Sequence, residues 1–203
     1  MTKEETVNEF KKYLNNINKN EERVKDVLNE IDNMNFEGNE YIDDSYLFLN
    51  TTILMSPAKR GNIWEKHMIY KTSGTKIPSS DDKGDFVCGE YGFCESKIST
   101  TNDGENLNMK QLRLWQEIDT YICGYIDYEN PDRSRFYILS KDDMKEQWEK
   151  YGGYMHGTKD SNKNNNKPSL SLSIKPYSMK SKKTKEWNDR FLDNDYKKKF
   201  FNK

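Results

Sequence analysis

The pattern of hydrophobic and polar positions along the chain has two periods. Apolar residues every three to four positions predict amphipathic helices, and apolar residues every second position predict half-buried strands. Helices are expected at residues 3–17, 21–34, 57–71 and 141–151, and strands at 93–99, 121–126, 136–139 and 168–175. This order of elements predicts a mixed α/β fold, in which helices flank a central mixed β-sheet.

The strand at 93–99 belongs to a predicted β-hairpin, because two apolar runs flank the turn-rich stretch from Gly89 to Gly92. Glu95 and Lys97 are two positions apart on this second strand, so both side chains leave the same face. Asp85 opens the first strand. The hairpin therefore brings two carboxylates and an ammonium group together.

Such a cluster has the chemistry of a metal-assisted phosphodiester hydrolase. Two carboxylates can hold a hard cation such as Mg2+, and a lysine can position the attacking water or stabilise charge on the phosphate. Asp85 and Glu95 are the predicted metal ligands, while Asp81 and Asp82 compete with Asp85 for that position. The alternative interpretation is an exposed strand edge with an ordinary salt bridge.

The spacing of Asp85, Glu95 and Lys97 resembles that of the PD-(D/E)xK nuclease superfamily. The segment Lys59-Arg60-Gly61 with the downstream Glu65 is similar to the helix that precedes this hairpin in many type II restriction endonucleases. The resemblance implies a restriction-endonuclease-like fold, a Mg2+ cofactor and double-stranded DNA as the partner. It also implies that Asp85, Glu95 and Lys97 are catalytic and that Glu65 is a supporting carboxylate, for which a surface ion pair with lysine is the alternative.

Several further positions are candidates for DNA contact. The Gln-x-Arg-x-Trp segment ahead of an Asp-x-Tyr strand also resembles the restriction enzymes, where it runs beside the active site. The loop at 152–167 is rich in glycine, asparagine and lysine, which suits either base contacts in the major groove or a solvated loop. The candidate DNA-binding residues are Lys59, Arg60, Gln111, Arg113, His156, Lys163, Asn164, Asn165 and Asn166.

The 203 residues suit a single domain, with an acidic helical hairpin at 1–45, a catalytic core at 56–174 and a basic, aromatic end at 175–203. The net charge of −1 conceals this gradient, which suggests that the basic end faces a polyanion. We expect the end to form a packed helix. The acidic hairpin offers an interface away from DNA, so we expect a homodimer.

Three cysteines without zinc-finger spacing predict buried free thiols. No apolar run approaches the length of a membrane span or a signal peptide, so a cytoplasmic protein without a membrane partner is expected.

These observations favour a type II restriction endonuclease that hydrolyses double-stranded DNA at a specific short sequence with Mg2+. Two alternatives stay open. A DNA repair nickase or junction resolvase on the same fold would share the active site without base-specific loops. A noncatalytic DNA-binding module would carry the same carboxylates as surface groups and would cut no DNA.

Overall fold

The computed structural model describes residues 57–101, 104–128, 130–152 and 168–201. The chain divides into two compact units, one of residues 1–63 and 201–203 and the other of residues 64–200. Both β-sheets and the predicted hairpin belong to the second unit. Within the described part of the chain, no helix is long and apolar enough to cross a membrane.

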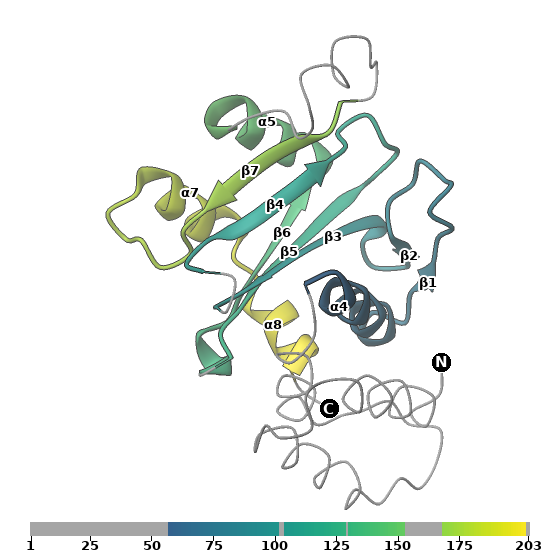
Figure 1. Ribbon diagram of the computed structural model, residues 1–203, viewed down its shortest axis with the longest axis horizontal. Coiled ribbons are helices and arrows are strands. Elements are labelled where there is room, and N and C mark those ends of the chain that lie inside the picture. Colours follow the sequence, from purple (N-terminus) through teal and green to yellow (C-terminus); the bar gives the residue numbers. More distant parts are fainter. Residues whose placement is uncertain (1–56, 102–103, 129, 153–167, 202–203) are drawn as a thin grey trace, which may run out of the picture. The chain divides into compact units, whose positions relative to one another are not determined.

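The main sheet has five strands in the order β1-β2-β3-β5-β6 (Figure 1). Neighbouring strands are antiparallel except for β3 and β5, which are parallel. The strands are β1 (Thr75–Lys76), β2 (Phe86–Cys88), β3 (Gly92–Thr100), β5 (Thr120–Ile126) and β6 (Arg135–Ser140). The β2–β3 pair is the predicted hairpin, and the sheet is mixed as expected.

A second, antiparallel sheet consists of β4 (Leu107–Leu112) and β7 (Leu170–Ile174). Leu170, Leu172 and Ile174 are buried, as the alternation in the sequence predicts. β4 contacts β3 and β5, and the backbone N–H of Asn108 donates to Ser99 Oγ of β3 at 2.9 Å. The small sheet therefore packs against one face of the main sheet.

Four helices complete the described architecture: α4 (Pro57–Lys71), α5 (Lys141–Tyr151), α7 (Lys182–Phe191) and α8 (Asn194–Phe201). A 3-10 turn, η2 (Pro131–Arg133), precedes β6. The predicted helix at 57–71 is confirmed, with proline at its first position, where a missing N–H costs nothing. Ser140 caps α5 as expected, because its side chain accepts a hydrogen bond from the Asp143 N–H.

The two faces of the main sheet have separate cores. On one face Tyr121, Cys123 and Tyr137 belong to a cluster with residues of β4, β7, α5 and α7. On the other face Phe136 packs against Phe200 of α8, with ring centroids 4.6 Å apart, and Phe200 stacks on Trp64 of α4 at 5.0 Å. The α4–α8 pair and the small sheet thus cover opposite faces.

Three details differ from the prediction. The loop predicted at 72–83 contains the short strand β1, and β4 begins at Leu107, inside the polar loop expected before Met109. The basic end forms two helices and not one, because the chain leaves helical geometry at Leu192, which forms a β-bridge with Tyr137. Asp193 then accepts a hydrogen bond from the Tyr196 N–H at 2.6 Å, which starts α8.

The three cysteines are buried free thiols, as predicted. Cys94 lies on β3 and Cys123 on β5, where their small apolar side chains fill the interior of the sheet.

Candidate active site

The hairpin brings Asp85 directly against β3, because Gly84 lets the two backbones approach closely. The Asp85 N–H donates to the Cys94 carbonyl at 2.8 Å. Gly84 has a φ of 85°, and a Cβ at this position would lie 2.5 Å from the same carbonyl oxygen. Only glycine satisfies both conditions without strain. Gly84, which directly precedes the candidate metal ligand Asp85, therefore permits the close approach of this segment to β3.

The Asp85 carboxylate is held by a single residue of β3. Its Oδ2 accepts hydrogen bonds from the Ser96 N–H at 2.8 Å and from Ser96 Oγ at 2.9 Å. Its Oδ1 forms no hydrogen bond with any residue in the described ranges. One oxygen fixes the orientation of the carboxylate, and the other has the free lone pairs that a ligand would need.

Glu95 and Lys97 form an ion pair on one face of β3, as their spacing predicts. Glu95 is 5 % exposed, and the Lys97 side chain is also largely shielded from solvent. Burial raises the pKa of the Glu95 carboxyl group, because a charged group loses hydration there. Lys97 lowers this pKa, and the nearby Asp85 raises it further. The two carboxylates are thus close enough to interact electrostatically.

The segment after β4 contributes one more charge to this region. Arg113 is close enough to lower the pKa of Glu95, so this DNA-contact candidate lies near the catalytic candidates. Gln111 is exposed at an irregularity in β4 and has a left-handed φ of 56°. The structure thus places Arg113 where its charge influences Glu95.

Glu65 lies on the other face of the sheet. Its carboxylate pairs with Lys76 of β1 at 2.8 Å, and Lys76 is opposite Phe86, which in turn is opposite Cys94. Cys94 and Glu95 are adjacent on β3, so their side chains leave opposite faces. The supporting catalytic role of Glu65 stays a prediction, while the lysine partner agrees with the surface ion pair named as its alternative.

Of the other DNA-contact candidates, only the side chain of Arg60 lies within the described residues. His156, Lys163, Asn164, Asn165 and Asn166 lie outside the described residues, as does the side chain of Lys59. Arg60 is a buried position, 6 % exposed, on the first turns of α4.

Tyr121 is a neighbour of Glu95 that the sequence did not single out. The parallel register places it opposite Glu95, and Cys123 opposite Lys97. Its hydroxyl is buried and makes no hydrogen bond with the described residues. Burial and the neighbouring Glu95 raise its pKa, so the hydroxyl stays protonated and can donate. In the sequence, Tyr121 is recognisable only as part of the Asp-x-Tyr strand. Its position opposite Glu95 depends on the register between β3 and β5, which the sequence does not reveal.

Asp85 and Glu95 are the two carboxylates that would hold a magnesium ion, because each influences the other electrostatically. Among the described residues, no group of three or more His, Cys, Asp or Glu side chains is arranged to hold a metal. Mg2+ nevertheless often binds through one or two carboxylates and completes its shell with water and substrate phosphate oxygens. A cation beside Glu95 would also compensate two nearby negative charges in a poorly hydrated position.

No family model matches the chain, and no curated protein matches it.

Proposed function

We propose that the protein is a magnesium-dependent type II restriction endonuclease that hydrolyses phosphodiester bonds of double-stranded DNA at a specific short sequence. The observation that carries the proposal is the joint placement of Asp85, Glu95 and Lys97 on the β2–β3 hairpin of a mixed sheet. The resemblance to PD-(D/E)xK nucleases agrees with this placement.

Each residue has a role that follows from its contacts. Asp85 and Glu95 would hold Mg2+, which lowers the pKa of bound water and shields the negative phosphate. Lys97 shares one side of β3 with Glu95, so its ammonium group can orient the attacking water or stabilise charge on the phosphate. Arg113 adds a second positive charge near the same carboxylate.

Tyr121 has a different role in this proposal. Its buried hydroxyl, which has no hydrogen-bond partner within the described ranges, can donate to Glu95, which lies opposite it. The residue is a positioning candidate because it sits directly opposite the buried carboxylate.

The test is plasmid cleavage with Mg2+, followed by sequencing of the DNA ends. Asp85→Ala, Glu95→Ala and Lys97→Ala should each lower the cleavage rate by about two orders of magnitude or more, which corresponds to a loss of ~3 kcal/mol of transition-state stabilisation. EDTA should abolish cleavage by the unchanged protein. Ends at one fixed sequence would support a restriction enzyme, while scattered ends or nicks at structural defects would support a repair nickase or resolvase.

The matched control is Asp81→Ala, an exposed aspartate of the same segment whose backbone N–H bonds the Pro78 carbonyl. This variant should cleave at the normal rate. Near-normal cleavage by Lys97→Ala together with inactive Asp81→Ala would contradict the proposed site.

The Glu95–Lys97 ion pair also favours one second candidate. Because the two charges already neutralise each other, the pair can serve a noncatalytic DNA-binding module as a structural contact. Such a module would bind DNA but would release no cleavage product with Mg2+ or any other divalent ion.

A further inference from the structure

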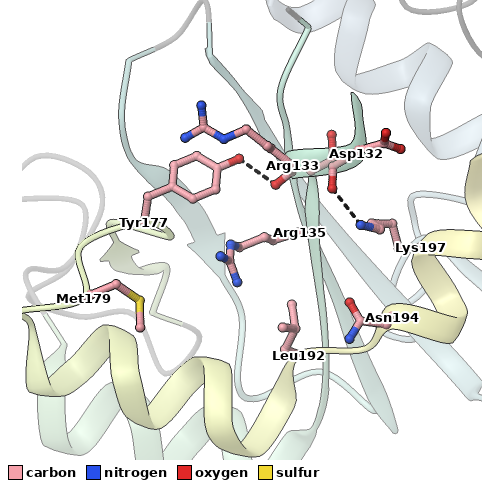
Figure 2. A pocket seen from close by; sticks show the side chains of 9 residues that line it. Asp132, Arg133, Arg135, Tyr177, Met179, Leu192, Asn194 and Lys197 are labelled. Atoms are coloured by element: carbon pink, nitrogen blue, oxygen red, sulfur yellow. Dashed lines mark hydrogen bonds between the residues drawn. The ribbon is translucent and has the colours of Figure 1, made fainter. Parts of the chain in front are cut away.

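A second polar site lies at the far end of the main sheet. A pocket of about 430 Å³ opens between η2, the start of β6, the segment after β7 and the α7–α8 junction (Figure 2). Arg135 lies opposite Tyr125 on β5, whereas Glu95 lies opposite Tyr121. These two tyrosines are four positions apart, so the pocket is about 13 Å farther along the strands at ~3.3 Å per residue. The pocket is thus separate from the candidate active site.

Positive charge dominates the lining of this pocket. Arg133, Arg135 and Lys197 contribute three cationic groups, and Asp132 is the one acidic residue among its lining residues. Lys197 Nζ donates to the backbone carbonyl of Asp132 at 2.8 Å, so this ammonium group is oriented without being neutralised. Arg133 has a distant partner outside the lining, with 3.8 Å between its Nε and Asp127 Oδ2. The pocket therefore keeps an excess of positive charge.

Arg135 is the strongest indication of a ligand. Its Nε is buried and forms no hydrogen bond, and within the described part of the chain its guanidinium forms no hydrogen bond or ion pair at all. A buried donor without a partner destabilises a fold, so such groups call for an explanation. Figure 2 shows the Arg135 guanidinium inside the pocket, between Tyr177 and Leu192. An anion bound there would satisfy it.

Tyr177 holds both guanidinium groups in place. Its ring centroid is 4.6 Å from the Arg133 guanidinium and 5.2 Å from that of Arg135, which is within cation–π distance. The Tyr177 hydroxyl in turn donates to the Arg133 carbonyl at 2.7 Å. Two guanidinium groups anchored on one ring are preorganised, so binding an anion costs little additional side-chain entropy.

We propose that this pocket binds a phosphate group, from either a free nucleotide or the backbone of a nucleic acid. Guanidinium groups match the geometry of phosphate oxygens through paired N–H donors, and a lysine adds a point charge. The volume falls within the range of small-molecule sites. Met179 and Leu192 add an apolar wall that suits the organic part of a nucleotide.

Isothermal titration calorimetry of the full-length protein in EDTA tests this inference without DNA cleavage. The probes are inorganic phosphate, deoxyadenosine monophosphate and a 12-base-pair duplex without terminal phosphates. Arg135→Gln should weaken binding at least tenfold, and Lys197→Gln should weaken it by a smaller factor. Lys197→Gln alone decides the result if Arg135→Gln does not fold.

The control is Arg190→Gln, which removes the same charge from an exposed arginine paired with Asp143 and Glu146 on the outside of α7. If the mononucleotide binds and Arg135→Gln weakens that binding, the pocket is a small-molecule site. If only the duplex binds and Arg135→Gln weakens that binding, the pocket contacts the nucleic-acid backbone. Absence of binding by all three probes, or an equal loss in Arg190→Gln, overturns the inference. Because no cleavage is measured, these results are independent of the proposed nuclease activity.

Discussion

At the residue level, Glu95 is a buried carboxyl group whose ionised form destabilises the fold. It is almost fully buried, and burial raises its pKa above the ordinary value of 4.5 although Lys97 opposes the shift. A carboxyl group whose pKa is higher in the folded than in the unfolded protein binds protons more strongly when folded. The free energy of unfolding is therefore greatest below the unfolded pKa and falls as the pH rises through the folded pKa.

This linkage predicts the effect of Glu95→Gln, which imitates the protonated carboxyl group. The variant should melt at a higher temperature than the unchanged protein at pH 8, because it lacks the poorly hydrated charge. The difference should disappear below pH 4, where Glu95 is protonated in both states. Thermal unfolding followed by circular dichroism across this pH range measures the difference.

Glu90→Gln is the control with the opposite sign. The Lys199 ammonium group bonds Glu90 and lowers the pKa of its carboxyl group, so the ionised form stabilises the fold. Glu90→Gln should slightly lower the melting temperature at neutral pH, and the effect should fade as the pH falls below 4.5. A Glu95→Gln variant that is less stable than the unchanged protein at pH 8 would contradict our interpretation of the buried site.

At the scale of elements, the hairpin depends on close contact between the turn before β2 and the backbone of β3. Gly84 is the point of contact, and Asp85 follows it directly, so the strand geometry and the carboxylate position are coupled. A displaced backbone at Gly84 would also move the hydrogen bonds from Ser96 that orient Asp85.

We therefore predict that Gly84→Ala is strongly destabilising. A left-handed alanine costs about 1–2 kcal/mol, and the forced shift against the Cys94 carbonyl adds about 1–3 kcal/mol. Gly104→Ala is the matched control, because Gly104 has a φ of 100° but no atom within 4 Å of its added Cβ among those described. Urea unfolding should give a larger loss for Gly84→Ala, and equal losses would show that the close contact is unimportant.

At the scale of the whole molecule, the proposed function carries a prediction about symmetry. A palindromic DNA site is most simply matched by a two-fold symmetric protein dimer, so we predict a homodimer. The acidic segment at 1–45, which was expected to form the interface, lies outside the described residues. Light scattering of the full chain, free and with its cognate duplex in EDTA, measures the mass. A monomer in both conditions would contradict the prediction.

Lysines of the basic end contact other parts of the protein, although the composition of this segment suggests that their charge faces a polyanion. Lys198 pairs with Asp195 and Lys199 pairs with Glu90, and Lys197 lies at the Arg135 pocket. The aromatic residues of the same segment are buried, including Tyr196 and Phe200. Positive charge in a sequence thus identifies a basic segment, but the neighbours supplied by folding decide how much of that charge is free for a polyanion.

Features that depend on a few neighbouring residues could be predicted from the sequence. The helix beginning at Pro57, the Ser140 cap and the shared face of Glu95 and Lys97 all follow from local geometry. The alternation at 168–175 likewise predicted that Leu170, Leu172 and Ile174 of β7 are buried, whereas the burial of Ser171 between them depends on packing.

Which of these elements contact one another could not be predicted from the sequence and became apparent in the folded chain. The parallel register of β3 and β5 places Tyr121 opposite Glu95, and folding pairs Glu65 with Lys76 of β1. The Arg135 pocket likewise joins segments more than 40 residues apart, such as those of Arg135 and Tyr177. Such contacts depend on strand register and on packing across a long chain separation, which spacing within one segment does not encode.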